Sequence, residues 1–150
     1  MARFAYRMQT ILNLRYNQED QAKTAFGEAA AALAEQEDRL KHLKNRKSIY
    51  EQEGQELRKA PLLDVQGISE NTYAVEQMDR LIAEQEGVVA EYETALERAR
   101  LRLTQAIQDR RMQERLRERA YEEYLEEERQ AEYKESDQRT SFVYSTTQRD

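Results

Sequence analysis

Apolar residues recur at intervals of three and four along residues 5–57, in a single seven-residue register. The register has two core columns three residues apart, and most of their members are apolar. The first reads Ala5, Leu12, Glu19, Phe26, Leu33, Leu40, Lys47 and Gly54, and the second Met8, Arg15, Ala22, Ala29, Gln36, Leu43, Tyr50 and Leu57. A sustained repeat of this kind indicates a helix in a left-handed coiled coil. We therefore predict a first helix over about residues 3–59.

The same repeat returns after residue 70. Its columns read Val75, Ile82, Val89, Leu96 and Leu103, and Met78, Gln85, Tyr92, Ala99 and Ala106, with Leu81, Val88 and Ala95 widening one flank. Beyond Leu103 the same register would place Arg110 and Arg117 in the core. The apolar residues of this part follow a shifted stripe instead, which predicts a stutter in the repeat: Ile107, Leu116, Ala120 and Tyr124. The second helix is expected over about residues 70–137. The last residues, 138–150, lose the pattern, and we expect a frayed tail.

Between the two repeats, turn-forming residues gather in the segment KAPLLDVQGISENT, which holds Pro61, the one proline of the chain. Proline lacks the N–H that a helix interior needs and clashes with the preceding turn, so we expect a tip over about residues 60–69. Ser69 is a candidate N-cap for the second helix. The predicted fold is all-α, a long antiparallel two-helix coiled-coil hairpin that forms a single domain over residues 1–150.

Charge favours antiparallel arms within one chain. With the tip near residue 65, residue i lies beside about 131 − i, and blocks of opposite charge then face each other. The basic block of residues 39–47 faces Glu84, Glu86 and Glu91, and Glu19 and Asp20 face Arg110 and Arg111. A parallel homodimer would place each block beside its own copy. One zone is poorly compensated, where the acidic residues of 51–56 face Glu76 and Asp79 with only Arg80 to offset them.

Composition agrees with a coiled coil and excludes several functional classes. Charged residues make up 36% of the chain and the net charge is -6, whereas a nucleic-acid binder usually has a basic surplus. The chain has no cysteine, so a disulfide framework and thiolate metal sites are excluded. No apolar run is long enough to span a bilayer or to form a signal-peptide core, so we expect a cytoplasmic protein.

The sequence carries no motif for catalysis. It has no glycine-rich phosphate loop, and its one histidine, His42, is expected to face solvent. A two-helix hairpin offers no concave site, so we expect no enzymatic activity and no cofactor. Arg111, Arg115 and Arg119 lie on one helix face with few acidic mates in the opposite arm, which suggests the acidic surface of a partner protein.

Two stretches resemble the flagellar export protein FliJ family. The N-terminal stretch is Phe4-x-x-Arg7-Met8-Gln9-x-x-Leu12-x-Leu14-Arg15, followed by Glu19, Ala22, Ala29 and Leu33. The C-terminal stretch is Glu114-Arg115-Leu116-Arg117-Glu118-Arg119 through Glu123-Tyr124, then Glu132 and Asp137. The resemblance implies a hairpin similar to the central stalk of rotary ATPases, working in the cytoplasmic part of the flagellar type III export system.

The resemblance also implies partners. The family engages the hexameric export ATPase FliI, promotes ring assembly, connects the ring to the membrane gate protein FlhA, and has been described as an escort for export chaperones. We expect the end that holds both termini to enter the ring, through Phe4, Arg7, Met8, Arg15, Arg111, Arg115, Arg119, Tyr121 and Tyr124. The candidate gate-binding residues are Tyr73, Met78, Leu81 and Ile82, although Met78 and Ile82 are equally explained as seam residues. A structural coiled-coil spacer and the stalk of a virulence injectisome are the alternative functions.

Overall fold

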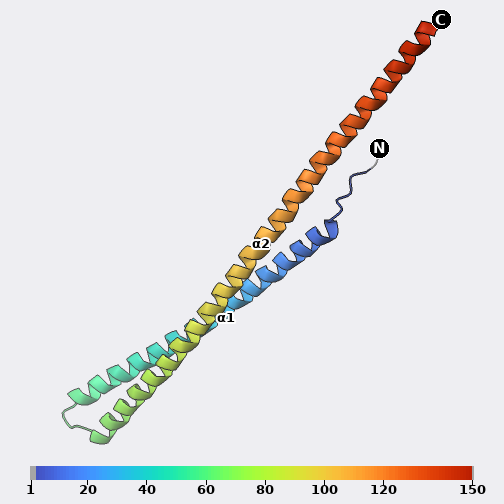
Figure 1. The fold of residues 1–150 in the computed structure, drawn as a ribbon. Coiled ribbons are helices and arrows are strands. Elements are labelled where there is room, and N and C mark those ends of the chain that lie inside the picture. Colours follow the sequence, from blue (N-terminus) through green and yellow to red (C-terminus); the bar gives the residue numbers. More distant parts are fainter. Residues whose placement is uncertain (1–2, 150) are drawn as a thin grey trace. The chain divides into compact units, whose positions relative to one another are not determined.

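The chain folds into two long helices. The structure is a computed structural model that describes residues 3–149. Helix α1 spans Gln9–Lys59 and helix α2 spans Val65–Arg149 (Figure 1). The two helices contact each other, and residues 3–149 contain no strand, so the predicted all-α helical hairpin is confirmed.

The contacts among the described residues group into two compact units. The hairpin unit consists of residues 21–104, and the terminal unit consists of residues 3–20 and 105–149. In a two-helix fold each residue meets only its helical neighbours and the residues opposite, so contacts collect locally along the helices. Each unit is described separately below.

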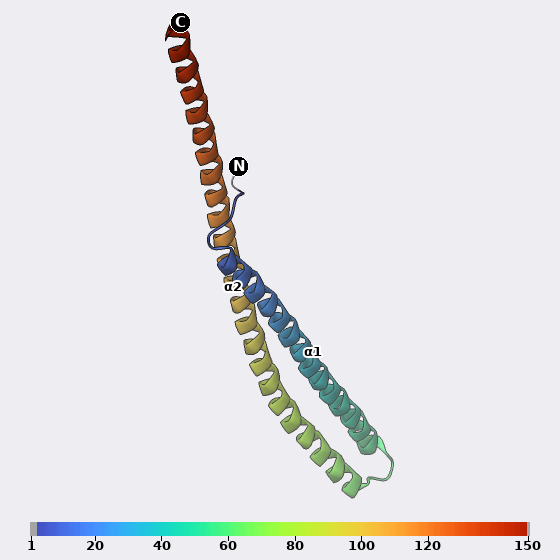
Figure 2. The ribbon, with the colours of Figure 1, turned by 90° about the vertical axis from the view of Figure 1, so that its right-hand side faces the viewer.

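The hairpin unit has the seam that the heptads predict. Its halves of α1 and α2 run antiparallel and are joined by the loop at residues 60–64 (Figures 1 and 2). Every predicted seam position from Ala22 to Leu57 and from Val75 to Leu103 is buried or half-buried. Met78, Val89 and Ala99 are the most enclosed apolar side chains of this unit. The flank is less closed than expected, because Leu81 and Ala95 are exposed.

Two buried polar contacts interrupt this apolar seam. The Gln85 side-chain amide donates to the backbone carbonyl of Gln36 at 3.0 Å and to its side-chain Oε1 at 2.9 Å. Nearer the loop, the Asn71 amide donates to the carbonyl of Tyr50 at 2.7 Å. Gly54 makes room for this Asn71 side chain, since a Cβ at residue 54 would overlap its amide oxygen. Buried polar groups with a single possible partner help to specify the register of paired helices.

Helix α2 begins earlier than the sequence predicts. It starts at Val65 instead of about residue 70, and its N-cap is Asp64 instead of Ser69. The Asp64 carboxylate accepts a hydrogen bond from the backbone N–H of Gly67 at 3.0 Å, and its backbone carbonyl accepts one from Ile68 at 3.0 Å. An N-cap side chain satisfies one of the otherwise free N–H groups of the first turn, so the helix forms from that point. The loop around Pro61 is confirmed but short.

Ion pairs across the hairpin unit follow the predicted charge blocks with a shift. Lys44 lies 4.0 Å from Glu86, within the blocks expected to face each other. Lys47, however, pairs with Asp79 at 2.6 Å and with Glu51 at 3.7 Å. The zone expected to be poorly compensated is therefore partly neutralised by Lys47, because the two arms are offset from the predicted register.

The first residues of the terminal unit are not helical. Residues 3–8 precede α1, so a helix start near residue 3 is wrong by about two turns. The backbone N–H of Gln9 donates to the Tyr6 carbonyl at 3.1 Å, which turns the chain at the helix start. Ala5 and Met8, both predicted in the seam, are exposed, because the segment places Phe4 against α2 in their stead.

At its other end α2 is helical to Arg149, and the frayed tail predicted for residues 138–149 is wrong; Asp150 lies outside the described residues. The hydroxyls of Thr140, Thr146 and Thr147 each donate to the carbonyl four residues earlier, at 2.9, 2.8 and 2.7 Å. Threonine is accommodated within a helix by such bonds. All side chains of residues 131–148 are exposed.

The stutter predicted after Leu103 is found in part and farther along the helix. Ala106, Arg110 and Gln113 continue the first register and are half-buried, but Arg117 is exposed. Of the predicted shifted stripe, Ile107, Ala120 and Tyr124 are half-buried and Leu116 is exposed. Only beyond Gln113 does the spacing change, with Ala120, Tyr124 and Glu128 half-buried at intervals of four. Arg110 occupies a seam position because a carboxylate of α1 faces it, as described next.

Candidate functional site

A cluster of charged and hydroxyl groups joins the two helices within the terminal unit. Glu19 is buried, with 6% of its surface exposed, and both of its oxygens accept hydrogen bonds from Arg110, at 2.6 and 3.3 Å. Arg110 also donates to Glu114 at 3.0 Å, and the hydroxyl of Tyr16 donates to the second oxygen of Glu114 at 2.6 Å. These groups take up each other's hydrogen-bonding capacity, as buried charges require.

The pKa values of this cluster shift in the directions that keep Glu114 and Arg110 charged and the Tyr16 hydroxyl protonated. The Tyr16 hydroxyl and, beside it, Arg110 lower the pKa of the Glu114 carboxyl. The same hydrogen bond raises the pKa of Tyr16, because ionising the phenol would remove its donated proton. The carboxylate of Glu19 raises the pKa of Arg110. The cluster is therefore a fixed link between α1 and α2.

Arg15 is also engaged within the terminal unit. Its Nη1 donates to Gln18 at 3.0 Å and to Asp109 of α2 at 3.4 Å. About 34% of its side chain is exposed. The structure thus gives Arg15, one of the residues expected to bind a partner, a contact between the two helices.

The N-terminal segment is held against α2 by aromatic side chains. The Phe4 ring lies 5.1 Å from the Tyr121 ring and 5.4 Å from the Tyr124 ring, measured between centroids. The guanidinium of Arg117 stands 5.8 Å from the centre of the Phe4 ring, within range of a cation–π interaction. The Tyr6 hydroxyl donates to Gln113 at 3.2 Å.

Beside this segment lies an open hollow of about 720 Å³. Its walls combine cations, anions and apolar groups, among them Arg3, Arg7, Met8, Leu116, Arg119, Glu123 and Glu127. Arg3 and Arg7 thus lie around the same hollow as Glu123 and Glu127. A surface of this mixed character suits a protein segment better than a small molecule.

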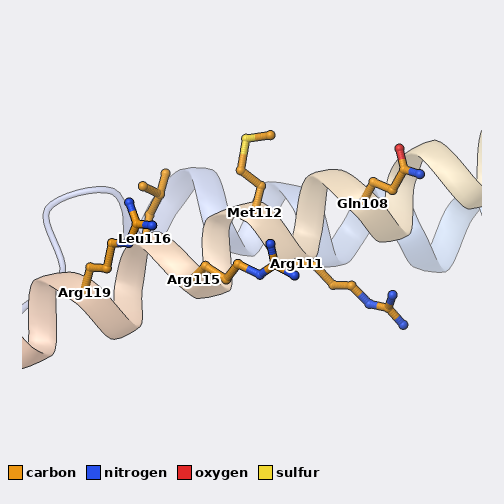
Figure 3. A pocket seen from close by; sticks show the side chains of 6 residues that line it. All are labelled: Gln108, Arg111, Met112, Arg115, Leu116 and Arg119. Carbon is orange, nitrogen blue, oxygen red and sulfur yellow. The ribbon is translucent and has the colours of Figure 1, made fainter.

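A second, shallower hollow of about 430 Å³ runs along one face of α2 (Figure 3). Its lining consists of Gln108, Arg111, Met112, Arg115, Leu116 and Arg119. Residues three and four apart share a face of a helix, so the three arginines form a row beside the two apolar side chains. Met112 is 61% exposed and Leu116 is 39% exposed. Within residues 3–149 none of the three arginines forms an ion pair. We call this face the arginine stripe.

The structure gathers the residues expected to bind the ATPase ring in one unit. Phe4, Arg7, Met8, Arg15, Arg111, Arg115, Arg119, Tyr121 and Tyr124 all belong to the terminal unit. Two apolar members of the stripe, Met112 and Leu116, are missing from that set. Their spacing of four residues, interleaved with the arginines, is a signal that could have identified them.

The four residues expected to bind the export gate belong to the hairpin unit and differ in exposure. Tyr73 is 63% exposed and Leu81 is 41% exposed. Met78 is buried and Ile82 is half-buried in the seam, which agrees with the alternative reading of these two residues. Only Tyr73 and Leu81 offer an accessible side chain.

Other classes of site find no support in the described part of the chain. No group of three or more His, Cys, Asp or Glu side chains among residues 3–149 could hold a metal ion. His42 is exposed and has a neighbour that the sequence did not suggest, because its Nε2 lies 3.4 Å from a carboxylate oxygen of Asp38. Neither helix, over the residues described, is apolar enough along its length to cross a membrane.

Comparison with known proteins decides the family. A family model described as "Flagellar FliJ protein" matches residues 4–149, which is nearly the whole chain. The chain belongs to the flagellar FliJ family. Membership of the FliJ family makes it a flagellar protein related to export, and the resemblance in the two sequence stretches is confirmed. No curated protein and no solved structure matches the chain.

Proposed function

We propose that the protein is a non-catalytic stalk and escort of the flagellar type III export apparatus. In this proposal it binds the hexameric export ATPase FliI, promotes assembly of the ring, and links the ring to the export gate protein FlhA at the cytoplasmic face of the membrane. Membership of the FliJ family supports the export context. The observation that carries the ATPase contact is the arginine stripe, with its exposed Met112 and Leu116.

The chemistry of the stripe fits an acidic protein surface. Arginine is enriched among residues that dominate binding energy, since its planar donors can grip a carboxylate while its stem packs on apolar groups. The three guanidiniums of the stripe have no ion pairs within residues 3–149, so a partner would not have to displace an internal carboxylate. Met112 and Leu116 would add apolar contact area between them.

The dimensions of the terminal unit also suit a ring. Each helix with its side chains is about 10–12 Å in diameter, so two packed helices are about 20 Å across and could enter the central opening of a hexamer. The contacts of Glu19 with Arg110 and of Tyr16 with Glu114 hold the two helices together there. On this proposal they allow the pair to enter as one body.

The gate contact in this proposal involves the hairpin unit. Tyr73 and Leu81 are exposed apolar side chains early in α2, and exposed aromatic groups are common anchors at protein interfaces. We propose that they contact FlhA, whereas Met78 and Ile82 serve the seam. The change of both Tyr73 and Leu81 to Ala should weaken FlhA capture while ATPase stimulation is retained.

The test is ATP turnover by the cognate export ATPase, with and without the protein, alongside sizing of the ring. We expect stimulated turnover and a larger hexamer fraction. The variant R111E/R115E/R119E should lose both effects, whereas R80E/R98E/R102E, which reverses three exposed arginines of the hairpin unit, should retain them. Unchanged turnover and sizing with the folded wild-type protein would contradict the stalk function and favour a gate-side escort or a structural spacer.

A further inference from the structure

The face of α2 that carries the arginine stripe changes its sign of charge halfway along. Arg111, Arg115 and Arg119 are followed, in further steps of three and four residues, by Glu123, Glu126 and Glu127. All six side chains are exposed. Each step of four residues turns the position by about 40° around the helix. Arg115, Arg119, Glu123, Glu126 and Glu127 therefore fall within about a third of the circumference and form one surface that is basic in its first half and acidic in its second, with Arg111 at its edge.

This face is largely separate from the packing inside the terminal unit. Residues of α1 and the N-terminal segment make their ion-pair, hydrogen-bond and ring contacts with Asp109, Arg110, Gln113, Glu114, Arg117, Tyr121 and Tyr124 of α2. All of these positions except Asp109 lie at least a quarter of a turn around the helix from Met112 and Glu126. Leu116, Arg119, Glu123 and Glu127 stand at the border, where they also edge the hollow beside residues 3–8.

Almost all of the charge on this face is unpaired in the single chain. Neither the three arginines nor Glu123 and Glu127 form an ion pair within residues 3–149. Glu126 forms an ion pair with Arg129 of the same helix, at 3.7 Å. The acidic half cannot fold back onto the basic half, because α2 is a continuous helix through both. Another molecule with the opposite order of charge would neutralise the two halves together.

We propose that this molecule is a second copy of the chain, docked antiparallel on the same face. A two-fold axis near residue 121 places Arg119 of one copy beside Glu123 of the other, and Arg115 beside Glu127. Because a two-fold contact is isologous, each of these pairs forms twice. Met112 and Leu116 then pack against the aliphatic stems of Gln130 and Glu126 of the second copy.

A parallel arrangement of the two copies would be disfavoured by the same charged residues. A parallel pair would set Arg115 beside Arg115 and Glu123 beside Glu123, and like charges at a helix interface destabilise it. A partner with an acidic helix alone would neutralise the arginines but leave the glutamates beside its own carboxylates. The alternation along this face therefore favours the second copy over a uniformly acidic partner.

The pairing should be weak and salt-dependent. It joins single helix faces over about 20 residues, which places it among the small interfaces of transient complexes. Exposed ion pairs supply much of its specificity, and salt screens them. The inference needs only the chain itself. If the proposed function also holds, the second copy covers the arginine stripe and competes with the ATPase.

The test is sedimentation equilibrium of the full chain up to about 100 µM, in about 50 mM and about 500 mM salt. We expect a reversible monomer–dimer equilibrium whose association constant falls about tenfold or more at the higher salt. The variants R115E/R119E and E123R/E127R should each lose self-association. An equimolar mixture of the two should form a heterodimer, since each of the four ion pairs again joins an arginine to a glutamate, two of them with their charges exchanged.

Controls separate a lost interface from a lost fold. Far-UV circular dichroism should show unchanged helicity for both variants, and R98E/R102E, on the hairpin unit, should dimerise as the wild type does. A wild-type chain that stays monomeric in low salt would overturn the inference and leave the face to a different protein. Dimers that persist in R115E/R119E, or a mixture that fails to associate, would overturn it as well.

Discussion

Charged residues at seam positions act as structural contacts in the terminal unit. Glu19 and Arg110 occupy core columns of the two predicted repeats, and the structure joins them by two hydrogen bonds. From sequence, Arg110 suggests a break in the repeat. The signal that the repeat continues is that Glu19 also occupies a core column, because a buried cation is tolerated where a carboxylate faces it.

This pair gives a first prediction. Glu19→Leu should lower the melting temperature by several degrees, because it leaves the Arg110 guanidinium half-buried without its main partner. The double variant E19L/R110L should regain most of the loss, since both charges are then replaced by seam-compatible side chains. Thermal unfolding followed by circular dichroism measures both. A double variant less stable than Glu19→Leu would contradict this account.

The glycines of the helices separate into two kinds at the residue scale. A Cβ at Gly54 would overlap the Asn71 amide, whereas a Cβ at Gly27 or Gly87 meets nothing within 4 Å. Gly54→Ala should therefore destabilise the fold by about 1–3 kcal/mol through overpacking. Gly27→Ala and Gly87→Ala should each stabilise it by about 0.5–1 kcal/mol, as helix propensity predicts. Chemical denaturation of the three variants tests the contrast, which would be refuted by a stabilising Gly54→Ala.

Glu114 makes the stability of the terminal unit depend on pH. Its pKa is lowered in the folded chain by the Tyr16 hydroxyl and by Arg110. The contribution of Glu114 to the free energy of unfolding is therefore fully present above the unfolded-state pKa of about 4.3. It is lost as the pH falls through the lower folded-state pKa. The melting temperature of the wild type should drop more steeply between pH 5 and pH 3 than that of Glu114→Gln. Parallel slopes for the two proteins would show that Glu114 does not contribute.

At the scale of whole elements, the repeat could predict the helices but not all of their ends. Seam positions were predictable because a period of seven residues buries one stripe of each helix, whatever the detailed contacts. The start of α2 was not, because Asp64 and Ser69 are both acceptable N-caps and the sequence does not rank them. The row of arginines in α2 could be predicted from the sequence. The exposure of Met112 beside it could not, because it depends on which face of α2 packs against α1.

The cap of α2 gives a prediction at this scale. Asp64→Ala should destabilise the hairpin unit by about 1 kcal/mol, because the N–H of Gly67 loses the carboxylate that it donates to. Ser69→Ala is the matched control and should change stability little, since residue 69 is an exposed position inside the helix. Urea denaturation measures both differences. A larger effect at Ser69 than at Asp64 would contradict the position of the cap.

For the molecule as a whole, local charge order matters more than net charge. The chain is acidic, at -6, yet the three arginines of the stripe, which form no ion pair with any residue of 3–149, make a local basic surface next to exposed apolar groups. Because salt screens charges beyond a Debye length of about 8–10 Å, a bound partner interacts mainly with this local surface and little with the net charge of the chain. An acidic chain can therefore bind an acidic surface, and the binding should weaken as salt rises.

The most direct test of the central claim is the affinity of the purified export ATPase for the wild-type chain and for two variants, measured by surface-immobilised binding at low salt. We expect R111E/R115E/R119E to bind about tenfold more weakly or worse, because each reversal replaces an attraction with a repulsion. R80E/R98E/R102E should bind as the wild type does. Equal affinities for the wild type and the stripe variant, with unchanged helicity, would contradict the assignment of the arginine stripe to the ATPase.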